Sequence, residues 1–404
     1  MKETIKSPSI FKQALMVDKK PFPWLKAFLA GIATGVPILV MILLGNLEYG
    51  LIAALGGFTY LYVFPIPYAQ LAKKLAWVVL GITVAVFLGT LLAPYPIISA
   101  ITMGLIGATA IFLFGAFRLI GPSAIFFVLI FSMTTGMPIA PDEAFIRAGL
   151  VLMSGAFSWC IAMMGWFFNP HGPEKKAVKS TYIALAELLE VLDTDQVNNA
   201  QHQVMNRIKE TSQTLASAYL SWHKSKLFNQ LYELNNRANK MYLSIVEGNT
   251  IHHAKELAQT LRGIAQALDS KELESAAKLI HIPQIDILNE QTLLLFNELT
   301  NIKVCLLDAS PTKIEEFHFA TANVKRILIG AFDKNSIILI NALRFGVFTF
   351  IAAFIAYEFH FNRSFWIPLS CAAVMSGTTA VATFHRAIQR SLGTIFGILL
   401  ASII

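Results

Sequence analysis

The sequence has little charge for its length. Only 14% of its 404 residues are Asp, Glu, Lys or Arg, whereas a soluble globular chain carries about a quarter. Hydrophobic residues make up 55% of the chain, and the mean hydropathy is +0.58. This composition excludes an ordinary soluble domain and predicts an integral membrane protein.

Cysteine is also scarce, and the motifs of common enzymes are absent. The three cysteines, Cys160, Cys305 and Cys371, lie far apart and match no disulfide or metal-binding spacing. The sequence contains no GxxxxGK[ST] phosphate loop, no HExxH and no nucleophile elbow. We therefore expect no enzyme activity, no cofactor and no metal site.

The charges that are present lie mostly in the middle of the chain. Residues 172–335 contain 18 of the 32 Lys and Arg and 19 of the 25 Asp and Glu. Two apolar blocks therefore flank one polar segment. We predict an N-terminal segment at 1–24, a membrane domain at 25–170, a helical domain at 171–335 and the start of a second membrane domain at 336–404.

Apolar runs predict the membrane spans. The first block has six, at 25–44, 50–64, 72–92, 97–117, 121–137 and 144–168. The second block has spans at 336–359 and 364–384, and a third begins in the closing stretch. Lys and Arg cluster at alternate connections, so the positive-inside rule places the N-terminus and residues 171–335 in the cytoplasm.

The polar segment shows helical periodicity. In residues 176–195, apolar side chains recur at steps of three and four, which gives one buried stripe of Tyr182, Leu185, Leu188, Leu189 and Leu192. Similar stripes occur at 203–220, 250–268 and 284–307. We expect an antiparallel helical bundle against the cytoplasmic mouth of the membrane part.

The two apolar blocks match weakly as copies. A shift of 316 residues places Lys74 on Arg390, and Lys26 meets Arg344 after a two-residue gap. Both copies enter from the cytoplasm, which predicts a parallel repeat. We therefore expect an all-α, polytopic protein with six spans, a cytoplasmic helical bundle and about three spans of an incomplete second repeat.

Cations within or beside the spans are candidate binding groups. Arg344 lies about nine residues into its span, where it either binds an anion or extends to the headgroups. Arg386 and Arg390 share one helical face and either hold a carboxylate or serve as positive-inside anchors. The same alternatives apply to Lys73 and Lys74. Arg147 is expected to pair with the acidic residues 142–143.

Other polar and aromatic residues also have two interpretations. Trp366 either stacks on an aromatic substrate or belongs to an aromatic belt. Two segments rich in glycine and hydroxyl residues, at 132–138 and 375–384, either line a polar path or pack helices closely. Close packing is the favoured interpretation.

The second block resembles the FUSC family, the fusaric-acid-resistance and aromatic-acid-exporter type of membrane protein. The resemblance rests on Arg344 in NALRFG, Trp366 in SFWIPL, and the run Thr383, Arg386, Arg390, Gly393, Thr394 and Gly397. It implies a two-repeat protein with cytoplasmic helical domains that exports aromatic carboxylic acids with the proton gradient.

The leading hypothesis is therefore a proton-driven exporter of aromatic carboxylates or related organic anions. Arg344, Arg386 and Arg390 would hold the carboxylate, Trp366 would contact the ring, and His385 would couple protons. The alternatives are an organic-anion channel of the plant malate-channel type and a membrane scaffold whose helical domain binds a partner. The expected location is the bacterial inner membrane. The expected partners are small organic anions, the lipid bilayer, and either a second copy or a periplasmic adaptor, with no nucleic acid.

Overall fold

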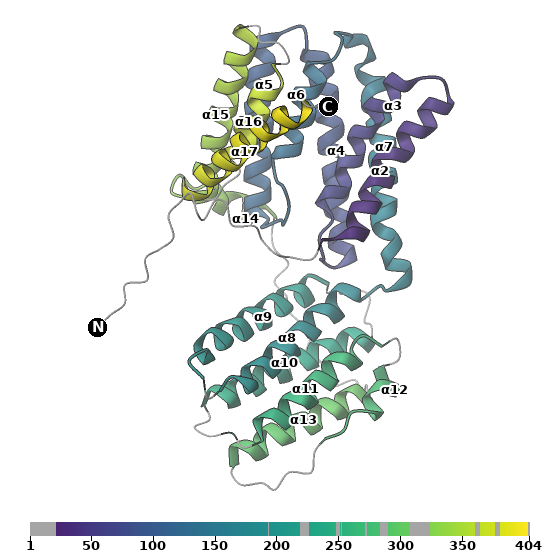
Figure 1. Ribbon diagram of the computed structural model, residues 1–404. Helices are drawn as coiled ribbons and strands as arrows, with labels where there is room; N and C mark the ends of the chain where they lie inside the picture. Colours follow the sequence, from purple (N-terminus) through teal and green to yellow (C-terminus); the bar gives the residue numbers. More distant parts are fainter. Residues whose placement is uncertain are drawn as a thin grey trace, which may run out of the picture. The chain divides into compact units, whose positions relative to one another are not determined.

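A computed structural model describes residues 22–192, 194–218, 226–247, 251, 253–270, 273–282, 290–307, 324–359, 364–375 and 380–402. Every regular element in these residues is a helix (Figure 1). They form two compact units. The membrane unit lies within residues 1–64, 74–162 and 322–404, and the helical unit lies within 65–73 and 163–321. The domain boundaries predicted from the sequence stay a prediction.

Five helical segments are long and apolar enough to cross a membrane. They are Trp24–Leu43 (α2), Tyr68–Leu92 (α4), Pro96–Ala116 (α5), Pro141–Phe168 (η2 and α7) and Ile337–Glu358 (α15). Four of them coincide with predicted runs of the first block, and α15 coincides with the first predicted span of the second block. The chain is thus an all-helical protein with membrane-spanning helices, and its repeat arrangement stays a prediction.

Three predicted spans differ from single long helices. The run at 50–64 forms α3 (Leu47–Ala54) followed by the 3₁₀ helix η1 (Leu55–Tyr62), and the run at 121–137 forms only α6 (Ile125–Thr135). In the second block, α16 (Trp366–Met375) and α17 (Ala380–Ala401) divide the predicted span at 364–384. The predicted count of six spans plus about three is therefore not confirmed.

The 3₁₀ helix η1 packs tightly against neighbouring helices. A Cβ atom at Gly56 would lie 2.0 Å from the Ser154 hydroxyl oxygen and 2.5 Å from the Val151 carbonyl oxygen of α7. Only glycine permits so close an approach. On the same element, a Cβ at Gly57 would lie 2.3 Å from Thr34 of α2. The close approach of η1 to α2 and α7 therefore requires glycine at both positions.

The helices α5 and α15 make the most extensive contact in the described residues, and they lie side by side in Figure 1. Their backbones approach closely at Gly104 and Gly346, because a Cβ on Gly346 would lie 2.9 Å from the Gly104 carbonyl oxygen. Small residues allow such crossings in membrane helices. This crossing joins the first apolar block to the second.

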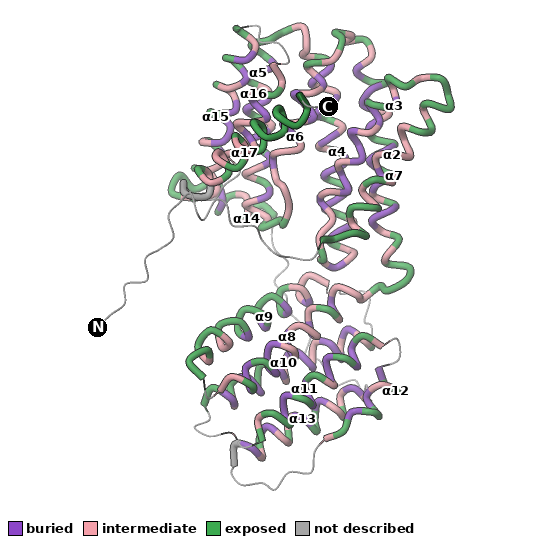
Figure 2. The backbone as a smooth tube through the Cα atoms, viewed as in Figure 1, coloured by how far each residue is buried: buried purple, intermediate pink, exposed green. Residues whose placement is uncertain are grey.

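The helical unit contains α8 (Gly172–Glu190), α9 (Val197–Ala218), α10 (Lys226–Glu247), α11 (Ala254–Ala267), α12 (Leu273–Lys278) and α13 (Glu290–Leu307). Buried residues recur along these helices (Figure 2) and form one apolar core. Tyr182, Leu185, Leu188 and Leu189 are at most 2% exposed, and Leu192 packs against this core. The predicted stripe is therefore confirmed.

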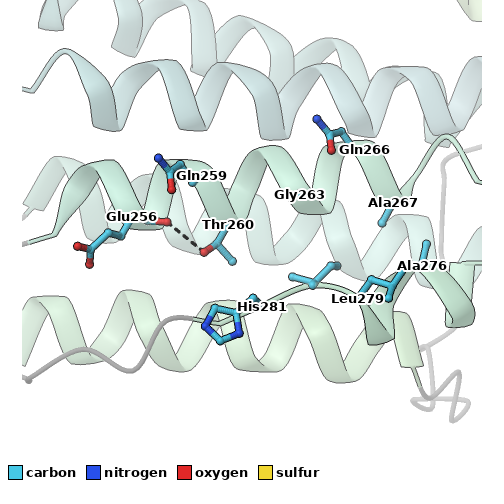
Figure 3. Close-up of a pocket in the computed structure, with 10 residues that line it drawn as sticks. Glu256, Gln259, Thr260, Gly263, Gln266, Ala267, Ala276, Leu279 and His281 are labelled. Atoms are coloured by element: carbon cyan, nitrogen blue, oxygen red, sulfur yellow. Dashed lines mark hydrogen bonds between the residues drawn. The ribbon is translucent and has the colours of Figure 1, made fainter.

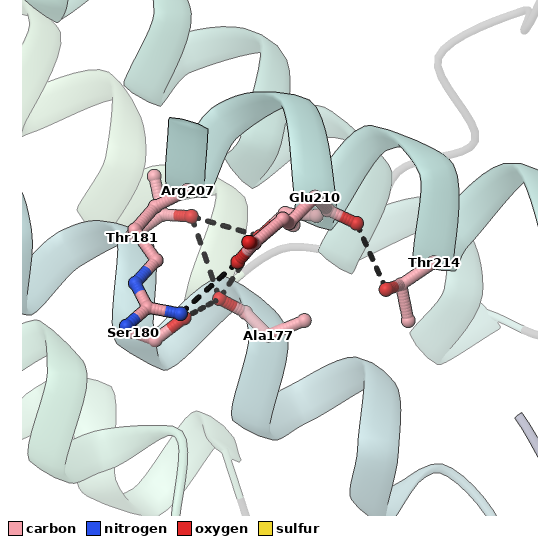
Figure 4. Close-up of polar contacts among 7 residues, drawn as sticks. Ala177, Ser180, Thr181, Arg207, Glu210 and Thr214 are labelled. Atoms are coloured by element: carbon pink, nitrogen blue, oxygen red, sulfur yellow. Dashed lines mark hydrogen bonds and ion pairs between the residues drawn. The ribbon is translucent and has the colours of Figure 1, made fainter. Parts of the chain in front are cut away.

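A buried polar contact ties α8 to α9 in the helical unit. The hydroxyl oxygens of Thr181 and Thr211 are 2.9 Å apart, and Thr211 also donates to the Ala177 carbonyl oxygen at 3.0 Å (Figure 4). On the exposed side of α9, Arg207 donates to Glu210 at 3.0 Å. The threonine pair satisfies polar groups that would otherwise be costly to bury.

The short helix α14 (Val324–Ala331) precedes α15 and packs against α5 in the membrane unit. Large apolar side chains are exposed on the membrane-spanning helices. On α2, Leu43 is 86% exposed, and only Ala33 is buried. Such apolar outer surfaces are expected where a helix faces lipid.

Candidate functional site

The most deeply buried cation on the α4 span is Lys74. Its side chain is 5% exposed. The ammonium group donates a hydrogen bond to the carbonyl oxygen of Tyr62 at 2.9 Å and a second one to the carbonyl oxygen of Ile120. It therefore ties the end of η1 to the loop between α5 and α6.

The side chain of Tyr62 also links the end of η1 to the loop between α5 and α6. Its hydroxyl donates to the carbonyl oxygen of Ser123 at 2.9 Å, and its side chain is fully buried. The ring lies 5.7 Å from that of Phe114 and 5.7 Å from that of Phe127. Aromatic pairs at such distances contribute about 0.5–1.5 kcal/mol beyond their burial, so the carbonyls that bind Lys74 are held in place.

A second lysine shares an aromatic ring with Lys74. The ammonium of Lys26, on α2, lies 4.4 Å from the centroid of the Phe64 ring, and that of Lys74 lies 4.9 Å from it. Each contact is worth roughly 0.5–2 kcal/mol. We call Lys26, Phe64 and Lys74 the lysine centre. No ion pair joins either lysine to a carboxylate within the described part of the chain.

The two lysines differ in what they offer a ligand. Lys74 already has two carbonyl acceptors and little exposure, so its ammonium group is held in place by the backbone. Lys26 is half-buried and makes no hydrogen bond to the residues that the structure describes. An anion that approached the centre would therefore find free donors on Lys26, beside an aromatic face.

The five predicted site residues come from three helices. Arg344 is half-buried on α15, Trp366 is the first residue of α16, and the other three lie on α17. Trp366 is 51% exposed, and its ring centroid is 5.5 Å from that of Phe365. Arg386 is exposed. A shared site for these five residues stays a prediction.

Two of these residues have informative surroundings. The Nε atom of Arg390 donates to the Ser370 hydroxyl on α16 at 3.3 Å, so α17 and α16 hold this guanidinium between them. The Nε2 atom of His385 is buried without a hydrogen-bond partner among the described residues. An imidazole nitrogen can donate or accept a hydrogen bond, so this atom has an unused polar position.

Arg147 has a structural role at the start of α7. It is 2% exposed, and its Nε donates to the Glu143 carboxylate at 3.0 Å. Both terminal nitrogens donate to the Pro138 carbonyl oxygen at 3.3 Å. The predicted pairing with the acidic residues is therefore confirmed for Glu143.

The first hydroxyl-rich segment mediates packing. Ser132 donates to the Phe365 carbonyl oxygen at 2.9 Å, and the hydroxyls of Thr135 and Tyr357 are 2.8 Å apart. A Cβ at Gly136 would lie 2.9 Å from the Phe365 ring. These contacts confirm the packing interpretation for 132–136. Much of the second segment, including 376–379, lies outside the described residues.

A hollow of about 490 Å³ lies in the helical unit, lined by α11 and by the segment that ends at His281 (Figure 3). Its titratable lining groups are Glu256 and His281, and Glu256 pairs with His253 at 2.9 Å. The lining therefore lacks the fixed positive charge that a carboxylate ligand requires.

The lysine centre is not among the site residues predicted from the sequence. The sequence leaves two interpretations open for Lys74, and Lys26 bears only on the topology and the repeat. The available signal was the repeat itself, because Lys26 and Lys74 align with Arg344 and Arg390. Nothing in the sequence showed that Phe64 lies between the two lysines.

These features define a polytopic α-helical membrane protein with buried cations and a helical domain inserted between its spans. Residues 351–404 match the family described as "Fusaric acid resistance protein-like". This match confirms the resemblance inferred from the arginine and glycine pattern of the second block.

A relative in Bacillus subtilis (strain 168) is similar over nearly the whole chain. It is described as "Uncharacterized membrane protein YvaC" and is 38% identical over 403 residues, which cover 98% of this chain and 62% of the relative. The chain therefore spans less than two thirds of that relative. No solved structure matches the chain.

Proposed function

We propose that the protein is a membrane transporter that exports organic anions, with aromatic carboxylates as the substrate class and protons as the driving ions. The observation that carries the proposal is the lysine centre, in which two ammonium groups contact the ring of Phe64 without an ion pair to a carboxylate among the described residues. A ligand that is both anionic and aromatic suits this combination of groups.

The chemistry of each group supports this substrate class. An uncompensated positive charge within a span is costly, and a ligand carboxylate offsets that cost. Lys26 supplies unused donors, and Phe64 offers a ring against which an aromatic substrate would pack. The second block also has cationic and aromatic candidates, namely Arg344, Arg390 and Trp366. His385 is the candidate for proton coupling.

Uptake into inverted membrane vesicles tests the proposal. With an inward-acidic pH gradient, we expect vesicles that contain the protein to accumulate labelled benzoate or hydroxybenzoate. The variant Lys26→Gln removes the available ammonium but no hydrogen bond within the described residues, so we expect the KM to rise about tenfold or more. Lys73→Gln is the matched control, because Lys73 is exposed and carries the same charge.

Three results would contradict the proposal. Equal KM values for wild type and Lys26→Gln would remove the lysine centre from the substrate path. Unitary currents carried by the acid in planar bilayers would indicate the channel alternative. The absence of any flux, combined with a phenotype that deletion of residues 172–335 abolishes, would indicate the scaffold.

A further inference from the structure

A second hollow in the helical unit has a cationic lining. It encloses about 370 Å³ between the start of α8 and the segment that follows α11. Its polar lining comes mainly from one helix face and from the turn opposite. We call it the lysine pocket and define it by Asn169, Lys175, Lys176, Lys179, Ser180 and Asp269.

Positive charge exceeds negative charge in this pocket. Lys179 forms an ion pair with Asp269, which is the acidic residue of the lining. Lys175 donates to the Ser270 carbonyl oxygen at 3.1 Å rather than to a carboxylate. Lys176 is exposed and has no partner among the residues described. Two of the three lysines therefore lack a neutralising carboxylate, and the pocket suits an anion.

The environment of Lys175 also favours an anionic ligand. Burial lowers the pKa of its ammonium, and the carboxylate of Asp269 raises it in part. A further negative charge in the pocket would favour the charged form of this lysine. Asn169 and Ser180 add uncharged polar groups to the lining, and such groups contact the oxygens of phosphates as well as of carboxylates.

The position of the pocket along the chain indicates where its ligand comes from. The candidate span Pro141–Phe168 ends directly before Asn169, the first residue of the lining. Its last residues carry large exposed aromatic side chains, with Trp166 at 50%, Phe167 at 77% and Phe168 at 82% exposure. Tryptophan is enriched at the headgroup level of a bilayer, and Trp166 lies three residues before Asn169. The lining of the pocket therefore begins where the chain leaves this span.

We propose that the lysine pocket binds the phosphate group of an anionic phospholipid in the leaflet where α7 ends. The bound headgroup would neutralise part of the excess charge on Lys175 and Lys176 and would attach the start of α8 to the membrane surface. A soluble phosphate has the same chemistry, but it gains nothing from the adjacent aromatic residues. The proposal does not depend on transport.

Lipid retention by the purified full chain tests this assignment. In detergent, dioctanoyl phosphatidylglycerol, dioctanoyl phosphatidylcholine and inorganic phosphate are titrated separately, and bound molecules are counted by native mass spectrometry. We expect the wild-type chain to prefer phosphatidylglycerol. A lysine near an anionic headgroup contributes about fivefold in affinity, so Lys175→Gln, Lys176→Gln and Lys179→Gln together should weaken binding more than about tenfold.

A matched control separates the pocket from general surface charge. Lys209, Lys240 and Lys255 are exposed on α9, α10 and α11 of the same unit, and their replacement by Gln removes the same charge elsewhere. We expect this control to keep wild-type affinity. The single variant Lys176→Gln, which loses no contact among the described residues, should weaken binding about fivefold without a change in thermal stability.

Several results would overturn the assignment. Retention of phosphatidylglycerol by the triple variant at the wild-type level would contradict it, as would an equal loss of affinity in the control. Inorganic phosphate that binds as tightly as the lipid and displaces it would make a soluble phosphate the ligand. An unchanged affinity in a stable Lys176→Gln variant would also contradict it.

Discussion

The ammonium nitrogen of Lys74 lies 2.9 Å from the carbonyl oxygen of Tyr62, twelve residues earlier in the chain. The same nitrogen also donates to Ile120, so one side chain satisfies two backbone carbonyls. A buried carbonyl that loses its donor costs about 1–3 kcal/mol. Lys74 therefore stabilises the membrane unit in addition to supplying charge.

Replacement of this lysine should reveal that role. We expect Lys74→Met to lower the free energy of unfolding by about 2–4 kcal/mol, because two carbonyls lose a charged donor and Phe64 loses a cation. Lys73→Met should change stability by less than about 0.5 kcal/mol, since Lys73 is exposed. Thermal unfolding in detergent compares the two variants. Equal stability losses would show that Lys74 does not hold the two loops.

The crossing of α5 and α15 gives a steric prediction. A Cβ on Gly346 would lie 2.8 Å from that of Ala108 and 2.9 Å from the Gly104 carbonyl oxygen. Gly149, on α7, has open space within 4 Å. Alanine is the better helix former by about 1 kcal/mol, so Gly149→Ala should be neutral or stabilising. Gly346→Ala should instead destabilise the protein by about 1–3 kcal/mol through overpacking.

Thermal unfolding compares these two glycine variants. The melting temperature should fall for Gly346→Ala, and it should stay the same or rise for Gly149→Ala. A stabilised Gly346→Ala variant would mean that α5 and α15 are further apart. The comparison also tests the contact between the two apolar blocks, because α5 belongs to the first block and α15 to the second.

Hydropathy predicted the long helices well, because an apolar run of that length can be recognised from the sequence alone. The runs at 25–44, 72–92, 97–117 and 144–168 each contain a helix that starts and ends within a few residues of the predicted limits. The division of the run at 50–64 into α3 and η1 was not predictable in this way. The close contact of Gly56 with Ser154 joins residues about a hundred positions apart in the chain.

Long-range contacts also explain why the surroundings of Lys74 could not be predicted from the sequence. The partner of Lys74 on the α5–α6 loop is the backbone of Ile120, and a backbone acceptor leaves no mark in the sequence. The helix α10 was also not among the predicted helices. Its stripe of Phe228, Leu231 and Leu234 is visible in the sequence as an apolar repeat at steps of three.

The core of the helical unit provides a matched pair on α10. Leu234 is fully buried, whereas Leu243 is 47% exposed. We expect Leu234→Ala to destabilise the protein by about 2–5 kcal/mol, because it removes buried methyl groups and leaves a cavity. Leu243→Ala should cost less than about 1 kcal/mol. Chemical denaturation followed by circular dichroism measures both. Similar losses would place α10 outside the core.

The last prediction concerns the thiol of Cys305 on α13. Burial raises its pKa from an ordinary value of 9.0 to about 11, and the carboxylate of Glu233 contributes in the same direction. The thiolate is the reactive form, so the reaction with a small alkylating reagent should be slow at pH 8. The two-unit shift reduces the thiolate about a hundredfold, and the greater nucleophilicity of a more basic thiolate recovers about tenfold. We therefore expect a rate about tenfold below that of an ordinary thiol.

A single-cysteine chain allows this rate to be measured directly. With Cys160 and Cys371 replaced by alanine, we expect the alkylation rate of Cys305 to rise continuously with pH until about pH 11. The control adds Lys240→Cys and replaces Cys305 by alanine, which places one thiol on an exposed position of α10. The rate of that thiol should level off about two pH units earlier, near the ordinary pKa. If the rate of Cys305 levels off near pH 9 instead, the thiol is more accessible to water than its contacts with the Gln230 backbone imply.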